Sequence, residues 1–187
     1  MITLGTGIGG GIFLNNGIFR GDHGMAGEIG HMTVHPDGYP CGCGNRGCWE
    51  LYASANGLVR LAEELKRNSD KNSSRKGKGK KSRSPLISPD GLGKLADRGD
   101  PFAISVFKQY GRYLGIGIAN LANVLNIETF VMGGGVLGSW RHFADSARRE
   151  IRRRAYVFIR KKVDLRKSLC GDSAGILGAA HTVYDNI

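Results

Sequence analysis

The chain has 187 residues, of which 41% are hydrophobic and 23% are charged, enough for one ordinary domain with an apolar core. No apolar run approaches the roughly 20 residues that cross a bilayer, and no basic stretch followed by an apolar one opens the chain, so we expect a cytoplasmic protein without membrane attachment. The net charge is +11, but residues 66–83 and 148–167 together hold 19 of the 27 basic and three of the 16 acidic residues. The positive charge is therefore confined to two segments.

Glycine-rich strands and turns are predicted at the start of the chain. Residues 2–4 are strand formers and lead directly into Gly5-Thr6-Gly7-Ile8-Gly9-Gly10-Gly11. Residues 12–14 and 18–20 are expected to pair around Asn15-Asn16-Gly17, because Asn and Gly tolerate the positive φ of a tight turn. Because a strand at residue 2 would normally have neighbours earlier in the chain, we expect that an N-terminal part of a longer protein is missing.

Two helices with a polar segment between them are predicted next. Leu58, Leu61 and Leu65 share one face of a helix over residues 53–67. Residues 68–84 then contain no apolar side chain, which predicts a flexible basic insertion over about 68–90. Asp100-Pro101 is typical of a helix start, and apolar spacing continues the helix to Leu125.

The rest of the chain alternates strands, glycine turns and helices. The second long helix contains Gly111, Gly115 and Gly117, which we expect to permit close packing. Residues 128–132 are expected to form a buried strand before Gly133-Gly134-Gly135, and a basic helix is predicted over about 143–155. Residues 171–180 predict a turn followed by a helix of small residues. This order is typical of an α/β fold.

Four potential metal ligands lie close together in the sequence: His31, Cys41, Cys43 and Cys48. One imidazole and three thiolates complete a tetrahedral zinc shell with no position left for water, which favours a structural ion. The alternative is three unrelated buried cysteines, which the tight spacing disfavours. Cys170 lies far from this cluster and is expected to be a small core residue.

Two carboxylates flank the predicted zinc loop. Glu28 precedes His31 by three residues and Glu50 follows Cys48 by two, so a metal that joins both segments would hold the carboxylates near one another. Carboxylates accept hydrogen bonds from sugar hydroxyls, and the second ring nitrogen of His31 would be free to face a ligand. The alternative interpretation makes both glutamates ordinary surface charges.

Two glycine turns are candidate nucleotide contacts. The turn at Gly5, Thr6, Gly7 and Gly9 can present backbone N–H groups to an anion, although it lacks the Gly-Lys-Ser/Thr of a P-loop. Gly133, Gly134 and Gly135 would let a flat nucleotide ring lie against the backbone. Each signal is weak alone, since a glycine turn is as often only a tight hairpin.

Together these residues resemble the ROK family (repressor, open reading frame, kinase), over essentially the whole chain except the basic insertion. The most specific part is Gly-Glu28-Ile-Gly-His31 followed by Cys41-Gly-Cys43-Gly-Asn-Arg-Gly-Cys48-Trp-Glu50. The resemblance implies an actin-like, ribonuclease-H-like α/β ATPase fold with two lobes, of which residues 1–187 are the C-terminal one, with the zinc and sugar loop at 27–50. It implies that Glu28, His31 and Glu50 bind the sugar. It also places Gly5, Thr6, Gly7 and Gly9 in the second phosphate motif and Gly133, Gly134 and Gly135 in the adenosine motif.

The resemblance implies an ATP-dependent hexose kinase that uses Mg²⁺ and phosphorylates glucose to glucose 6-phosphate. Family kinases also carry an Asp-x-Gly-Gly-Thr phosphate loop and an Asn-Asp pair whose Asp is the catalytic base, and neither is present. We therefore assign no catalytic residue and expect this chain alone to be inactive. The alternative is a sugar-sensing repressor of the same family without its N-terminal helix-turn-helix.

Two expectations concern partners. Family relatives are often homodimers, so the resemblance implies a homodimer here. Nucleic-acid binding through residues 66–83 and 148–167 is the third hypothesis, but no aromatic residue interleaves the first segment for stacking on bases, and charge runs are usually solvated.

Overall fold

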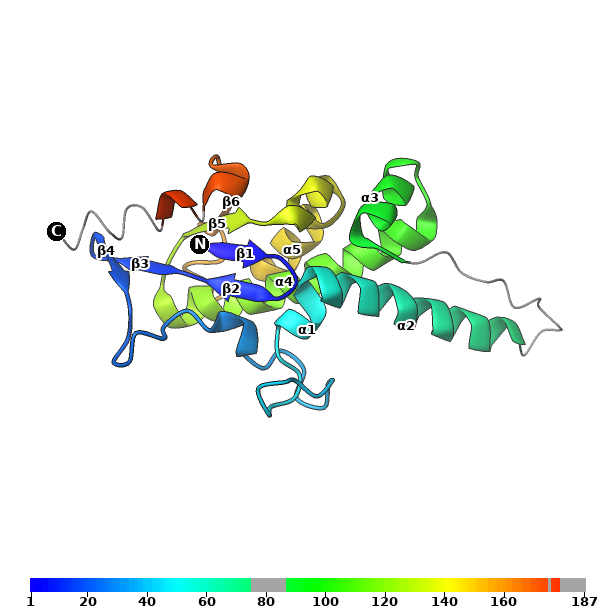
Figure 1. The fold of residues 1–187 in the computed structure, drawn as a ribbon, viewed down its shortest axis with the longest axis horizontal. Helices are drawn as coiled ribbons and strands as arrows, with labels where there is room; N and C mark the ends of the chain where they lie inside the picture. Colours follow the sequence, from blue (N-terminus) through cyan, green and yellow to red (C-terminus); the bar gives the residue numbers. More distant parts are fainter. Residues whose placement is uncertain (75–86, 175, 179–187) are drawn as a thin grey trace.

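A computed structural model describes residues 1–74, 87–174 and 176–178. Its strands are β1 (Ile2–Leu4), β2 (Ile8–Gly10), β3 (Ile12–Leu14), β4 (Gly17–Phe19), β5 (Thr129–Gly133) and β6 (Asp164–Lys167). The α-helices are α1 (Glu50–Ala53), α2 (Ala55–Ser74), α3 (Pro89–Asp97), α4 (Pro101–Leu125) and α5 (Trp140–Arg154). Short 3₁₀ helices lie at η1 (Ile29–His31), η2 (Gly135–Ser139) and η3 (Gly171–Ser173). The α/β class predicted from the sequence is confirmed (Figure 1).

The main sheet has the strand order β2-β1-β5-β6. Strand β1 pairs antiparallel with β2 and parallel with β5, and β5 pairs parallel with β6. Because β1 and β5 are parallel neighbours, their carboxyl ends lie at one edge of the sheet. The two glycine turns predicted from the sequence follow these ends, so the sheet brings them together although more than 120 residues separate them.

Strands β3 and β4 form a separate hairpin with the predicted turn. Leu14 faces Gly17, so Asn15 and Asn16 are the two central residues, with φ angles of 51° and 60°. Both angles lie in the left-handed region, which Asn tolerates better than most residues and which two-residue hairpins of this hand require. The predicted hairpin is confirmed.

Helix α4 forms the centre of the core. Asp100 caps its start, with its carboxylate accepting from the N–H of Ala103, as the Asp-Pro pair predicted. Added Cβ atoms at Gly111 and Gly115 would overlap the backbone of α5. These glycines therefore let α4 and α5 approach closely, which confirms their expected role.

The end of α2 differs from the prediction. The helix continues to Ser74, seven residues beyond the expected end at residue 67, and extends away from the body of the protein in Figure 1. Once buried residues such as Leu58 and Leu61 stabilise the first turns, each further residue adds a backbone hydrogen bond without needing a core contact. Residues 68–74, expected to be flexible, are therefore helical, and the part of the predicted insertion at 75–86 lies outside the described residues.

The last part of the chain also departs from one expectation. Cys170 is exposed and not a core residue, because it lies in the turn that leaves strand β6 at the edge of the sheet. The turn predicted at the start of 171–180 corresponds to η3, and helical residues follow at 174 and 176–178, while 175, 179 and 180 lie outside the described residues. Among the described helices, none has both the length and the apolar character to span a membrane.

Gly117 provides a test of the close packing around α4. A Cβ added there would overlap the indole of Trp49, which is fully buried, so we expect Gly117→Ala to lower the free energy of unfolding by about 1–3 kcal/mol. Gly138→Ala is the matched control, because its Cβ would meet no atom within 4 Å. Urea denaturation of both variants measures the difference, and equal stabilities would contradict this account of the packing.

Candidate functional site

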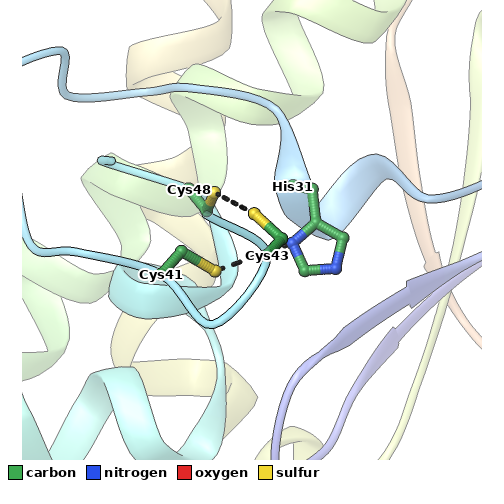
Figure 2. Close-up of side chains that lie close together, drawn as sticks. All are labelled: His31, Cys41, Cys43 and Cys48. Carbon is green, nitrogen blue, oxygen red and sulfur yellow. Dashed lines mark hydrogen bonds between the residues drawn. The ribbon is translucent and has the colours of Figure 1, made fainter. Parts of the chain in front are cut away.

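The four predicted metal ligands converge in the folded chain (Figure 2). His31 ends η1, and the three cysteines lie in the loop between η1 and α1. The four ligand atoms all lie within 4.8 Å of one another. Cys41 Sγ is 3.7 Å from His31 Nδ1, and Cys43 Sγ is 3.6 Å from Cys48 Sγ. The sequence prediction that these residues form one cluster is confirmed.

The Cys41–His31 and Cys43–Cys48 distances fit a tetrahedral zinc shell. Ligands 2.0–2.3 Å from a central ion, at the corners of a tetrahedron, are about 3.3–3.8 Å apart. Gly44 and Gly47 have φ angles of 91° and 70°, which an L side chain rarely adopts, and these two positions turn the loop back on itself. The donor set and spacing therefore suit one zinc ion held by a closed shell.

The thiols of the loop affect one another's pKa. Burial, together with hydrogen bonds and charge from the neighbouring thiols, raises the pKa of Cys48 to about 12. A hydrogen bond from the backbone at Asn45 lowers the pKa of the exposed Cys43 thiol. Three thiolates this close repel one another, and a divalent cation between them removes that repulsion while it displaces the thiol protons.

Aromatic side chains anchor the loop to the helices, a feature that the sequence analysis missed. Tyr52 packs against His35 and Tyr39 in the loop and against Tyr113 on α4. The Tyr52 hydroxyl accepts from the N–H of Tyr39 at 3.0 Å. Trp49 donates from its indole Nε1 to the carbonyl of Tyr113 at 2.9 Å. The aromatic residues 39, 49 and 52 surround the cysteine run in the sequence. Their positions could have predicted that aromatic packing anchors the loop.

The predicted sugar-binding residues lie together beside the metal ligands. Glu50 Oε1 is 3.8 Å from His31 Nδ1, and Glu28 Oε2 is 3.8 Å from His31 Nε2. The imidazole therefore presents Nδ1 to the cysteines and Nε2 to the more exposed side, where 67% of the Glu28 side chain is accessible. The structure confirms that the loop brings the two carboxylates to one imidazole.

Glu50 also contacts the first glycine turn. A Cβ added to Gly7 would lie 2.5 Å from Glu50 Oε2, so the carboxylate packs directly on this glycine. The carbonyl of Gly5 accepts from the N–H of Ala55 at 2.8 Å, which ties the same turn to the start of α2. Within the described residues, the N–H groups of Thr6 and Gly7 have no hydrogen-bond partner, so this turn has donors to offer an anion.

The second glycine run divides into two parts. Gly133 is buried in β5 opposite Thr3, whereas Gly134 and Gly135 are exposed in the turn that follows. Gly134 has a φ of 99° and packs on the backbone of Leu4, at the end of β1. Gly135 lines a groove of about 170 Å³ between η2 and α3, whose walls include Gly93 and Ser139. Helix α3 was not among the elements predicted to form the site.

Comparisons with known proteins agree with this arrangement. The sequence model of the ROK family matches residues 1–186. The chain belongs to the ROK family. A glucokinase from Streptomyces griseus, whose crystal structure was determined with glucose and AMPPNP, superposes with a TM-score of 0.81 at 38% identity, over 97% of this chain and 58% of that one. The fold is therefore the actin-like ATPase fold of ROK sugar kinases.

Relatives in the ROK family include both enzymes and regulators. The chain is 40% identical to a glucokinase from Halalkalibacterium halodurans over 98% of its length, and 34% identical to a xylose repressor from Bacillus subtilis over 99%. It spans 55% of that glucokinase and 44% of that repressor, or about half the length of the curated relatives it matches.

Metal analysis tests the cluster directly. We expect about one zinc per purified chain and a lower zinc content and melting temperature for Cys43→Ser, because three donors leave one position of the shell open. Cys170→Ser is the matched control, since that thiol is exposed and outside the cluster. Unchanged metal content and thermal stability in Cys43→Ser would rule out the zinc site.

Proposed function

We propose that this chain is the C-terminal lobe of an ATP-dependent ROK hexokinase, with residues 27–50 as its zinc and sugar loop and glucose as its substrate. The observation that carries this proposal is the placement of Glu28 and Glu50 on either side of His31, with Glu50 resting on the glycine turn. Glu50 is thus one of the proposed sugar-binding residues, and its carboxylate also contacts the glycine turn that has free N–H donors.

The sugar site consists of hydrogen-bond acceptors held in fixed positions. The two carboxylates accept from hydroxyl groups of a hexose, and His31 Nε2, which faces Glu28, adds a third polar contact. A zinc ion on Nδ1 and the three thiolates supplies rigidity to this loop. Glu28 and Glu50 then keep their spacing without the entropy cost of ordering the loop at each binding event.

The nucleotide site lies across the two glycine turns. The N–H groups of Thr6 and Gly7 can donate to phosphate oxygens, and the exposed Gly9 lies close by in β2, packed on the Thr3 side chain. The groove at Gly135, between η2 and α3, is open to the adenosine part of ATP. Mg²⁺ would accompany the phosphates and offset their charge.

Phosphoryl transfer itself requires further groups. Residues 1–187 contain neither an Asp-x-Gly-Gly-Thr loop nor an Asn-Asp pair, so no side chain is assigned as the base that orients the sugar hydroxyl. We propose that this chain by itself binds hexose and nucleotide without transferring phosphate. A homodimeric assembly and a cytoplasmic setting remain predictions from the family resemblance.

A sugar-sensing repressor is the second candidate function. The similarity to the xylose repressor of Bacillus subtilis, at 34% identity, supports it. The Gly5-Thr6-Gly7-Ile8-Gly9-Gly10 turn with its free donors favours the kinase, because sugar sensing alone needs no phosphate contact. The sequence upstream of residue 1 separates the two: a helix-turn-helix supports the repressor, and a phosphate loop with an Asn-Asp pair supports the kinase.

Glu28→Gln tests the sugar site. We expect glucose affinity, measured by isothermal titration calorimetry, to fall about 10-fold or more, because a hydrogen bond to a charged group contributes about 1.5–3 kcal/mol. Zinc content should not change, since Glu28 is not a ligand. Glu63→Gln, on the exposed side of α2, is the control and should bind glucose like the unmodified chain. A chain that binds no hexose, or equal affinities for both variants, would contradict the proposed sugar site.

Gly7→Ala tests whether the glycine turn positions Glu50. The new methyl group would displace the Glu50 carboxylate, so we expect glucose affinity to fall about 10-fold with little loss of stability, because only the flexible end of a side chain must move. Gly5→Ala is the matched control in the same turn, since its Cβ would meet nothing within 4 Å. Equal glucose affinities for the two variants would show that the contact with Gly7 does not set the position of Glu50.

A further inference from the structure

Helices α4 and α5 bring like charges together on a surface away from the sugar loop. Gly111 and Gly115 let the two helices approach so closely that an added methyl group would overlap the backbone of α5 at Phe143 and Ala147. Side chains that flank this crossing from both helices therefore share one groove. Because the helices are packed and rigid, these side chains cannot separate by moving their backbones.

The α4–α5 groove has a volume of about 420 Å³. Its lining residues are Ser105, Lys108, Gln109 and Arg112 from α4, and Ser146, Arg149 and Glu150 from α5. All of them except Glu150 carry a side chain that can donate a hydrogen bond. The groove therefore has many donors and three cations but one acid.

The Glu150 carboxylate already has ion-pair partners within the protein. Its carboxylate accepts from Arg153 and Arg154, and Arg112 Nε lies 3.8 Å from Oε1. Burial raises the pKa of the Glu150 carboxyl, but the bonds from Arg153 and Arg154 outweigh burial and hold the pKa below its usual value. Glu150 is therefore ionised at neutral pH and shared among three guanidinium groups.

Lys108 and Arg149 have no carboxylate partner among the described residues. Arg149 donates to the hydroxyl of Ser146 at 2.8 Å, which holds the guanidinium along the groove, and both cations are exposed. Lys108 and Arg112 lie four residues apart on α4, a spacing at which like charges destabilise a helix. A fold gains nothing in stability from this arrangement, whereas an anion in the groove would relieve it.

We propose that the α4–α5 groove is a binding site for a small ligand with two or more phosphate groups, bound by Lys108, Arg112 and Arg149. Its volume is that of a small-molecule site. None of its lining residues is aromatic, so it lacks the stacking surface on which single-stranded nucleic acid depends. The groove shares no residue with the proposed sugar and nucleotide contacts, so this inference goes beyond the proposed function.

Titration with inorganic pyrophosphate at 150 mM NaCl tests the proposal by calorimetry on the zinc-loaded chain. We expect saturable binding that Lys108→Ala and Arg149→Ala each weaken at least fivefold. Arg152→Ala is the matched control, because Arg152 is an exposed cation on the same helix that does not line the groove. It removes the same charge and should weaken binding less than twofold.

Each other outcome overturns the proposal. Equal losses in all three variants would mean diffuse attraction to a basic surface. Binding that none of the variants changes would place pyrophosphate elsewhere, such as at the free N–H groups of Thr6 and Gly7. Tighter binding of a ten-nucleotide single-stranded DNA through the same two cations would identify the surface as a nucleic-acid interface. Circular dichroism melting of each variant confirms that the exposed substitutions leave the fold intact.

Discussion

The insertion of Trp49 against Gly117 is the contact on which the candidate site depends. Three consecutive side chains have three different surroundings: Cys48 belongs to the cluster of potential metal ligands, Trp49 is buried on α4, and Glu50 lies beside His31. The indole needs a glycine beneath it and a carbonyl, that of Tyr113, to accept its N–H. This contact fixes the start of α1 against α4, the longest helix of the core. The Glu50 carboxylate, which follows Trp49 directly, is therefore attached to a well-packed part of the protein.

Two groups of side chains organise the loop: the potential metal ligands and a set of stacked aromatic rings. The donor cluster joins His31 to the cysteines, and the stacked rings of His35, Tyr39 and Tyr52 hold the middle of the loop against α1 and α4. A loop of this length without regular structure gains too little from burial to order itself. The stacked rings offset part of that entropy, and an ion held by the four donors would offset more.

Relatives of this chain in the ROK family include a glucokinase and a xylose repressor, and both match nearly the whole chain. Under either proposed function, Glu28, Glu50 and His31 would hold the sugar. The two proposals differ in whether the glycine turn, where free N–H donors lie beside the carboxylate of Glu50, contacts a phosphate. A phosphate at that turn and a sugar at Glu50 would be neighbours, which is the arrangement that phosphoryl transfer requires.

The sequence by itself determined the local features of this protein. The ligand spacing in Cys41-Gly-Cys43, the Asn15-Asn16 hairpin and the Asp100-Pro101 helix start depend on residues close in the chain, and all three are found in the structure. The end of α2 and the exposure of Cys170 were predicted wrongly, because a polar run and a small residue carry no information about which neighbours surround them.

Only the tertiary structure decided which distant residues meet. The parallel pairing of β1 with β5 puts two glycine turns at one edge, the contact of Gly7 with Glu50 joins the first of these turns to the start of α1, and the crossing of α4 and α5 gathers basic side chains into one groove. Spacing along the chain cannot specify these contacts. They arise from helices and strands that pack closely wherever a glycine leaves room, and that room exists only once both partners are folded.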